Sequence, residues 1–227
     1  ACGFCSDKTG KPPMYDEMEP VRTANAVKEM GLTHVVITSV DRDDLKDDFG
    51  ATIWAETINQ VHRMAPDCTV EVLTPDFQGH LPSLKKVFEA RPEIFSHNVE
   101  CVERISKKVR TQSIWQRTKS VLEASIEFGL LTKTGLMVGL GETDDEVLET
   151  MEEMASLGVE IFNVGQYLQP TKNHLEVDRF VHPNVFKMFK EKGLAMGYKV
   201  VESGPLVRSS YHADEQAKMY GVKSNQG

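Results

Sequence analysis

The chain has 227 residues, of which 40% are hydrophobic and 26% charged, as in an ordinary globular protein with one sizeable domain or two small ones. Its net charge of −8 argues against nucleic-acid binding, because a phosphate backbone favours a basic surface, and no apolar run approaches membrane-spanning length. Four cysteines are too few for a disulfide scaffold, so we expect a reducing compartment such as the cytosol.

A leading loop, residues 1–19, is followed by helix and strand patterns that alternate to the end of the chain. Apolar spacing and helix-ending glycines mark the helices, and Thr143 and Glu146 form a capping box at the start of one of them. Helices are predicted over residues 20–30, 51–64, 81–90, 102–108, 114–128, 144–154 and 183–196. Strands are predicted over residues 33–40, 69–74, 94–99, 130–140, 159–167 and 199–201.

The alternation of strands with helices predicts right-handed βαβ units, a parallel sheet and therefore an α/β fold. Six such units favour a closed or nearly closed barrel; an open doubly wound sheet is the main alternative, and periodicity does not separate the two. The β-branched run at 33–40 predicts a strand covered on both faces. In a barrel the chemistry collects in the loops after the strands, which are polar here. We expect one barrel domain over residues 1–213 and a mobile tail over 214–227.

Two of the cysteines, Cys2 and Cys5, form a C-x-x-C pair at the start of the chain, with an aromatic residue, Phe4, before the second cysteine. Two thiolates at this spacing reach one metal centre, which suits zinc, an iron–sulfur cluster or a redox disulfide. The pair alone leaves a zinc knuckle or two ordinary thiols open. Cys68 and Cys101 lie beside predicted strands and are expected to be small buried hydrophobic residues.

Four longer stretches add to this pair. They read T-S-V-D-R-D-D-L at 38–45, H-N-V-E at 97–100, K-T-G-L-M-V-G-L-G-E at 133–142 and G-P-L-V-R-S-S-Y at 204–211. With C-G-F-C at 2–5, they resemble the lipoyl synthase family of radical S-adenosylmethionine (SAM) enzymes along the whole chain. The R-S-S-Y sequence is specific, and it argues against another radical SAM sulfurtransferase such as one resembling biotin synthase. The resemblance implies a partial TIM barrel, (β/α)6-like, here lacking its first strand.

The resemblance also implies a site, residue by residue. Cys2 and Cys5 would be two of the three cysteine ligands of a [4Fe–4S] cluster whose open iron binds SAM. Ser210 would be the serine ligand of an auxiliary [4Fe–4S] cluster. The implied cofactor-binding residues come from the leading loop and from the strands and the loops after them: Phe4, Thr38, Ser39, Asp41, Arg42, Asp43, Asn98, Glu100, Gly135, Gly139, Gly141, Gln166 and Tyr167.

Each implied role has a chemical reason. The 38–45 loop would receive the amino-acid end of SAM, since its carboxylates accept from an ammonium and its arginine donates to a carboxylate. Asn98 and Glu100 would bond to the ribose hydroxyls, which need acceptors and donors side by side. Phe4 would pack near the adenine, and the glycines would let the backbone approach it. By residue type alone, the 41–48 loop also fits a solvated acidic loop and serine is a poor metal ligand, so both roles rest on the resemblance.

The activity that the resemblance implies is sulfur insertion at C6 and C8 of a protein-bound octanoyl group, which makes the lipoyl cofactor. Cluster and SAM radical would carry the chemistry, with no catalytic side chain. The implied cofactors are SAM and two [4Fe–4S] clusters per intact subunit. The implied partners are an electron donor and an octanoylated carrier, either the glycine cleavage H protein or a 2-oxoacid dehydrogenase E2. The expected location is the bacterial cytoplasm, or the mitochondrion in a eukaryote.

Parts of the family's pattern have no counterpart in this sequence. The family carries three further cysteines in an upstream C-x4-C-x5-C motif, and the first cysteine of its SAM motif would fall four residues before Cys2. We therefore expect the chain to be the C-terminal portion of such an enzyme, unable to complete either cluster and inactive alone. The alternatives are a non-catalytic barrel that docks the carrier protein and a zinc enzyme that uses Cys2 and Cys5.

Overall fold

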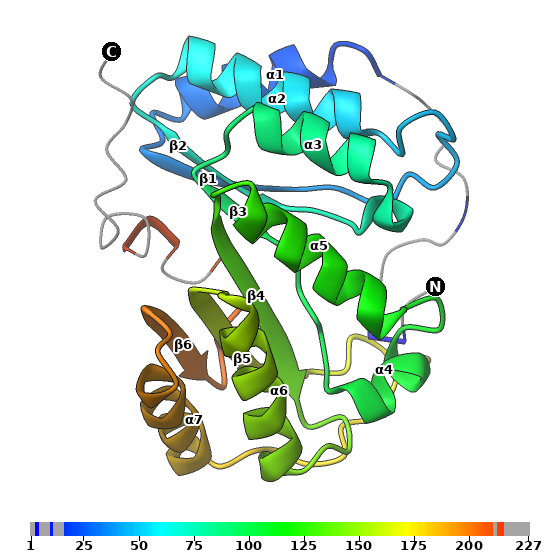
Figure 1. The fold of residues 1–227 in the computed structure, drawn as a ribbon, viewed down its shortest axis with the longest axis vertical. Helices are drawn as coiled ribbons and strands as arrows, with labels where there is room; N and C mark the ends of the chain where they lie inside the picture. Colours follow the sequence, from blue (N-terminus) through cyan, green and yellow to red (C-terminus); the bar gives the residue numbers. More distant parts are fainter. Residues whose placement is uncertain (1–2, 5–9, 11–15, 211–212, 216–227) are drawn as a thin grey trace. The chain divides into compact units, whose positions relative to one another are not determined.

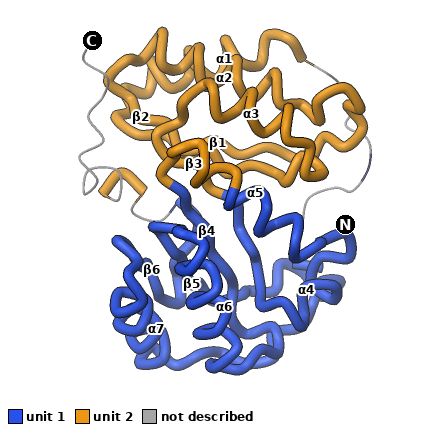
Figure 2. The backbone as a smooth tube through the Cα atoms, viewed as in Figure 1, with its two compact units in different colours: residues 1–10, 97–123, 132–211 blue, residues 11–96, 124–131, 212–227 orange. Residues whose placement is uncertain are grey.

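The computed structural model describes residues 3–4, 10, 16–210 and 213–215 (Figure 1). The chain divides into two compact units, shown in different colours in Figure 2. Unit 1 comprises residues 1–10, 97–123 and 132–211, and unit 2 comprises residues 11–96, 124–131 and 212–227. Within the described residues, six strands follow one another as β1-β2-β3-β4-β5-β6, and the pairing within each unit is parallel. The predicted α/β class is confirmed.

Unit 2 contains the first three strands and the helices between them. Its elements are α1 (Glu19–Glu29), β1 (His34–Thr38), α2 (Ala51–Met64), β2 (Thr69–Leu73), the 3₁₀ turn η1 (Phe77–Gly79), α3 (Leu81–Glu89) and β3 (Ile94–Ser96). β1 pairs with β2, and β2 with β3. α2 contacts both α1 and α3 (Figure 1) and buries Trp54, Ile58 and Val61, the apolar face that the sequence spacing predicted.

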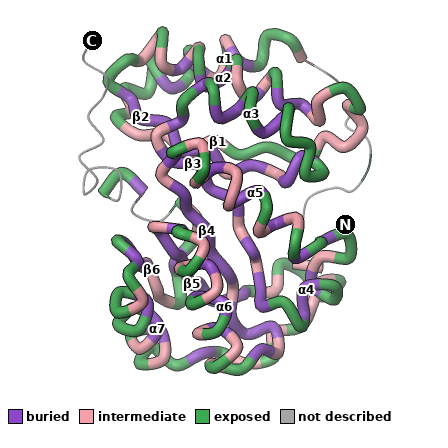
Figure 3. The backbone as a smooth tube through the Cα atoms, viewed as in Figure 1, coloured by how far each residue is buried: buried purple, intermediate pink, exposed green. Residues whose placement is uncertain are grey.

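The prediction that the first strand is covered on both faces is wrong. β1 is half-buried from His34 to Ile37, and Thr38 is exposed. By contrast, β3 is buried throughout and β2 at its first four residues (Figure 3). Among the described residues β1 pairs with one strand, β2, so its other edge lacks the neighbour that full burial requires.

Unit 1 contains the last three strands. Its elements are α4 (Glu103–Val109), most of α5 (Trp115–Glu127), most of β4 (Leu131–Val138), α6 (Asp144–Leu157), β5 (Ile161–Gln166), α7 (Pro183–Ala195) and β6 (Val200–Gly204). β5 pairs with β4 on one side and β6 on the other, and all its residues are buried. The capping box of α6 is confirmed: Thr143 Oγ1 accepts from Glu146 N at 3.2 Å, and Glu146 Oε2 accepts from Thr143 N at 2.8 Å.

The ends of β3 and β6 differ from the sequence prediction in a way that concerns the site. β3 ends at Ser96, because the chain turns there and Glu100, with φ of 69°, makes a single parallel bridge to Leu136. β6 continues to Gly204 and leads directly into the G-P-L-V-R-S-S-Y stretch. In the part of the chain that the structure describes, no helix is both long and apolar enough to cross a membrane.

Candidate functional site

Unit 1 contains a cavity of about 90 Å³ beside the C-terminal halves of β4 and β5. Its walls come from the turn after β3, from facing residues of the two strands, and from the segment after β6. The lining residues are Asn98, Glu100, Gly135, Leu136, Met137, Asn163, Gly165, Val207, Arg208 and Ser209. The carboxyl ends of parallel strands are where α/β folds bind ligands. The structure therefore brings together three predicted cofactor residues, Asn98, Glu100 and Gly135.

The turn after β3 supplies an acceptor and a donor at the cavity wall. The main chain of Glu100 is tied to β4, because its N–H donates to Gly135 O at 3.0 Å. The Asn98 amide donates to Ser209 Oγ at 2.9 Å. Burial raises the pKa of Glu100, an effect that the charge of Arg110 and a hydrogen bond with Asn98 partly offset. A carboxylate next to an amide suits a pair of sugar hydroxyls.

Asn98 is joined by two further side chains, Lys133 and Asn163, in holding the segment after β6. Lys133 of β4 is 1% exposed, and its Nζ donates to Ser209 O at 2.7 Å. Nδ2 of Asn163, on β5, lies 3.4 Å from the carbonyl oxygens of Arg208 and Ser209. Asn163 is 5% exposed, and its Oδ1 has no hydrogen-bond partner among the described residues. A buried acceptor without a partner costs free energy, so this atom points to a binding site.

The same segment crosses β5 where there is no room for a side chain. A Cβ placed on Gly165 would overlap the carbonyl oxygen of Val207, far inside van der Waals contact. Glycine is therefore required on β5 for Val207 and the residues after it to lie against the strand. Backbone contact and side-chain hydrogen bonds together fix the segment up to Ser209.

The three predicted metal ligands differ in what the structure describes of them. Ser210 is exposed and directly follows Ser209, which Lys133 and Asn98 clamp through their hydrogen bonds to its carbonyl oxygen and its hydroxyl. Cys2 and Cys5 lie outside the described residues, so cluster ligation stays a prediction for all three. Phe4, predicted to contact SAM, is half-buried in unit 1. Within the described part of the chain, no three His, Cys, Asp or Glu side chains are grouped so that they could hold a metal ion.

The remaining two cysteines are confirmed as small buried residues. Cys68 and Cys101 are free and only 2% and 1% exposed. Burial raises the pKa of the Cys68 thiol to about 11 and that of Cys101 to about 12. Both therefore stay protonated at neutral pH, which makes them inert as nucleophiles and metal ligands.

Gln166 and Tyr167, predicted to bind the cofactor, do not line the cavity. Gln166 is 3% exposed, its Oε1 accepts from Val181 N at 2.9 Å, and its Nε2 lies 3.0–3.1 Å from three carbonyl oxygens. Those three oxygens belong to Val138, Tyr167 and Arg179. The Tyr167 hydroxyl donates to Leu175 O at 2.7 Å. Both side chains thus hold the loop between β5 and α7 in place.

Of the three predicted glycines, Gly135 lines the cavity, whereas Gly139 and Gly141 belong to the loop after β4. That loop is closed by Glu142, whose two carboxylate oxygens accept from Gly139 N at 2.7 Å and Leu140 N at 2.9 Å. Gly139 has φ of 96°, and a Cβ there would lie 2.5 Å from Arg179 O. Loop packing therefore accounts for this glycine without an adenine beside it.

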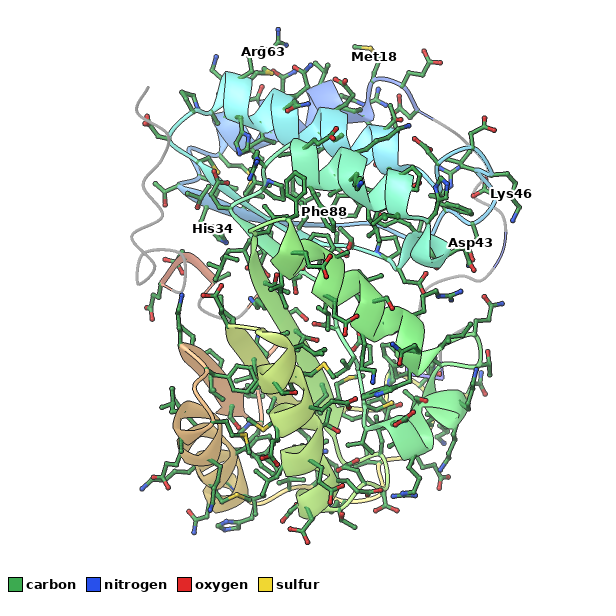
Figure 4. All side chains as sticks on the ribbon, in the orientation of Figure 1. Met18, His34, Asp43, Lys46, Arg63 and Phe88 are labelled. Atoms are coloured by element: carbon green, nitrogen blue, oxygen red, sulfur yellow. The ribbon has the colours of Figure 1, made fainter. Side chains whose placement is uncertain are left out.

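The end of β1 and the loop after it, in unit 2, hold five predicted cofactor residues: Thr38, Ser39, Asp41, Arg42 and Asp43, the last labelled in Figure 4. The Arg42 guanidinium makes a bidentate pair with the Asp44 carboxylate: Nε donates to Oδ1 at 2.8 Å and Nη2 donates to Oδ2 at 3.0 Å. Asp43 Oδ2 accepts from Nε2 of Gln78. Because its guanidinium is already paired, Arg42 binds a ligand carboxylate only in competition with Asp44.

Asp41 in this loop is expected to titrate near neutrality. Burial and the nearby carboxylates of Asp43 and Asp76 raise its pKa from 3.8 to about 6. The folded state holds this proton more tightly than the unfolded state, so the stabilisation is complete below pH about 4 and is lost as the pH rises through about 6. Carboxyl-detected NMR should give a midpoint near 6 that Asp43→Asn lowers. A wild-type midpoint near the model-peptide value of 3.8 would contradict the crowding of these carboxylates.

Comparison with known proteins first gives the class. The sequence model of the Radical SAM superfamily matches residues 1–154. The fold is similar to that of methylornithine synthase (PylB), with a TM-score of 0.63 and 13% identity over 92% of this chain and 69% of that one. It is also similar to HydG from Carboxydothermus hydrogenoformans, with a TM-score of 0.61 and 15% identity over 97% and 63%. The structural likeness concerns the fold alone. The family match makes the chain a radical SAM protein, and the cofactors of such a protein are SAM and a [4Fe–4S] cluster.

Closer relatives give the family within that class. The chain is 51% identical to the lipoyl synthase of Rubrobacter xylanophilus over 96% of its own length and 68% of the relative's. It is 48% identical to the lipoyl synthase of Flavobacterium johnsoniae over 95% of its length and 75% of the relative's, and 49% identical to that of Halalkalibacterium halodurans over 98% and 74%. The chain belongs to the lipoyl synthase family, as the five sequence stretches indicated.

Sequence reasoning missed Lys133, Asn163 and Ser209 as parts of this site. Lys133 and Ser209 lie in the stretches at 133–142 and 204–211, and Asn163 lies in the strand predicted over 159–167. A signal was present for Lys133 and Asn163, since an ionisable or amide side chain buried in a strand needs a polar partner. No local sequence pattern predicts the contact between Lys133 and Ser209, because the two residues lie 76 positions apart in the sequence.

Proposed function

We propose that the protein inserts sulfur at C6 and C8 of an octanoyl group that is amide-linked to a lysine of a carrier protein. The proposed carrier is the glycine cleavage H protein or a 2-oxoacid dehydrogenase E2, and a separate protein donates electrons. Two [4Fe–4S] clusters per subunit and a place in the bacterial cytoplasm, or in the mitochondrion of a eukaryote, complete the proposal. The observation that carries it is the 51% identity to a lipoyl synthase over 96% of the chain.

We assign the cavity in unit 1 to the nucleoside part of SAM on the chemistry of its lining residues. Glu100 offers a carboxylate acceptor, Asn98 an amide, and the buried Asn163 Oδ1 a place for a donor that the described residues do not fill. Gly135 keeps that stretch of the wall free of a side chain. We assign the ribose hydroxyls to Asn98 and Glu100 and the base to the neighbourhood of Gly135. When bound, SAM and its cluster supply the radical chemistry that removes hydrogen from an unactivated carbon.

The loop after β1 in unit 2 is assigned to the amino-acid end of SAM. Asp41 and Asp43 accept hydrogen bonds from the ammonium group, and Arg42 turns from Asp44 to the SAM carboxylate. Thr38 and Ser39 are exposed at the end of β1 and add hydroxyl donors.

The segment after β6 is assigned to the second cluster. Ser210 would ligate it, and the clamp on Ser209 would hold the hydroxyl in place. Cys2 and Cys5 are assigned to the cluster that binds SAM. Ser209, the neighbour of Ser210, is held by Lys133 on β4 and by Asn98 in the turn after β3, and Asn98 also lines the cavity.

The direct test uses the full-length protein, reconstituted with iron and sulfide under anaerobic conditions. It is incubated with an octanoylated carrier domain, SAM and a reductant, and the carrier is then weighed by mass spectrometry. We expect two sulfur atoms per octanoyl group, with about eight irons per chain for two four-iron clusters. SAM cleavage without sulfur transfer would indicate another radical SAM reaction, and carrier binding without SAM cleavage a docking barrel. One bound zinc would indicate the zinc enzyme.

Glu100→Gln is expected to weaken SAM binding about tenfold, because an amide with one acceptor oxygen replaces a carboxyl group with two. Calorimetry of SAM binding to the reconstituted protein measures this change. Glu103→Gln, three residues away and exposed on α4, is the matched control and should bind SAM as the wild type does. Equal affinities for all three proteins would remove the ribose contact from the proposal and leave sulfur insertion untouched.

A further inference from the structure

Gly3, which stands between Cys2 and Cys5 in the sequence, is hydrogen-bonded on both sides. Its N–H donates to the carbonyl of Val109, the last residue of α4, at 2.9 Å. Its own carbonyl accepts from Leu175 N at 2.9 Å. Three stretches of unit 1 therefore meet at this residue: the leading loop, the end of α4, and the loop between β5 and α7.

The contact at Gly3 leaves no space for adjustment on the side of Leu175. A Cβ placed on Gly3 would lie 2.9 Å from Leu175 Cγ and 3.0 Å from its Cδ1, distances at which the leucine must move. It would lie 3.5 Å from Val109 O, an ordinary contact. The position of Gly3 thus depends on where Leu175 is held.

Leu175 is held by Tyr167, the residue that follows β5. The Tyr167 hydroxyl donates to Leu175 O at 2.7 Å, and the tyrosine is 1% exposed. Its own main chain continues the pairing of β5 with β4, because its N–H donates to Val138 O at 2.8 Å. A continuous set of short hydrogen bonds therefore runs from the strand ends through Tyr167 and Leu175 to Gly3.

We propose that Tyr167 is a positioning residue for the cysteine pair of the leading loop, acting through Leu175 and Gly3. The proposal rests on the role proposed above for Cys2 and Cys5 as ligands of the SAM cluster. Metal centres require their ligands within about 0.2 Å of ideal distances, and groups that orient ligands change metal affinity by about tenfold or more.

Tyr198 offers a matched comparison in the same unit. Its hydroxyl donates to Met151 O at 2.7 Å, and the residue is 3% exposed. It joins the start of β6 to α6 and has no part in the bonds to Gly3. Tyr167→Phe and Tyr198→Phe each remove one buried hydroxyl-to-carbonyl hydrogen bond of the same length. A purely structural role for Tyr167 predicts the same consequences for both variants.

The test compares both variants with the wild type as full-length, reconstituted proteins. The rate of iron release to a coloured chelator measures how firmly the cluster is held, and EPR of the reduced cluster with and without SAM reports its geometry. We expect Tyr167→Phe to release iron about fivefold faster, the factor that one hydrogen bond supplies, and to alter the SAM-dependent EPR change. Tyr198→Phe should match the wild type in both. Gly3→Ala, which displaces Leu175 from the other side, should reproduce the faster release.

Each contrary outcome has its own meaning. Iron release and EPR spectra of Tyr167→Phe equal to those of the wild type would overturn the positioning role and leave the cysteines as ligands. A wild-type protein that binds no iron would overturn the ligand assignment of Cys2 and Cys5, and this proposal with it. Amide exchange in the iron-free protein tests the structural link separately: exchange at Leu175 should quicken about fivefold in Tyr167→Phe, and unchanged exchange would overturn the link.

Discussion

Gly165→Ala is expected to lower the rate of sulfur insertion about a hundredfold, because it drives the segment that carries Ser210 off β5. The added Cβ would overlap the Val207 carbonyl oxygen, and a backbone atom cannot rotate out of the way. Two residues further on, Ser209 is the point that Lys133 clamps, so the displaced main chain strains that bond as well. The free energy of unfolding is expected to fall by only about 1–3 kcal/mol, as for other overpacked sites.

Gly204→Ala is the matched control, since it faces the same residue from β6. Its Cβ would lie 3.4 Å from Val207 Cγ2, a side-chain atom that can move slightly, and activity should stay close to the wild-type value. Trypsin gives a readout that is independent of catalysis, because the bond after Arg208 becomes cleavable once the segment leaves the strands. Full activity and full resistance to trypsin at Arg208 in Gly165→Ala would contradict the docked position of the segment.

Gln166→Leu is expected to lower the free energy of unfolding by about 3 kcal/mol, and the melting temperature by roughly 10 °C. The substitution keeps the volume but removes an amide that bonds to main-chain groups on both sides of the loop after β5. Each buried group left without a partner costs about 1–3 kcal/mol, and Val181 N and Arg179 O are among those groups. Urea unfolding monitored by circular dichroism measures the loss.

Gln169→Leu, in the same loop, serves as the control. Gln169 is half-buried, and among the described residues its side chain makes one hydrogen bond, from Nε2 to His174 O at 2.9 Å, so its loss should cost less than about 1 kcal/mol. If Gln166→Leu kept wild-type stability and lost affinity for SAM instead, the sequence-based assignment of Gln166 to the cofactor would be correct and the structural one wrong.

The order of the elements followed from the sequence because the signals for helix and strand ends are local. The Thr143 and Glu146 box is three residues apart, and its two hydrogen bonds form within one turn of α6. Strand length was harder to predict: β3 is three residues shorter than predicted because its end is set by a bridge from Glu100 to β4, 36 residues away in the sequence. Only pairing with the other strand decides such a boundary.

The cavity was predicted in part, for a reason that belongs to the fold. Asn98, Glu100 and Gly135 were placed together because parallel strands bring their carboxyl ends to one edge. Gln166 occupies an equivalent position at the end of β5, yet its side chain bonds to main-chain groups. A polar residue at a strand end is thus compatible with a ligand or with loop closure, and only the neighbouring backbone decides between them.

Asn98 has two amide hydrogens, and the structure uses them for Ser209 Oγ, at 2.9 Å, and for the carboxylate of Glu100. A molecule in the cavity that accepts from Asn98 takes a hydrogen from one of these neighbours. Linked equilibria are reciprocal. If the hydrogen bond from Asn98 to Ser209 lowers the affinity of the cavity for a ligand, the bound ligand weakens the docking of the segment after β6 by the same factor. Binding of a ligand in the cavity and docking of the segment after β6 therefore compete for the amide nitrogen of Asn98.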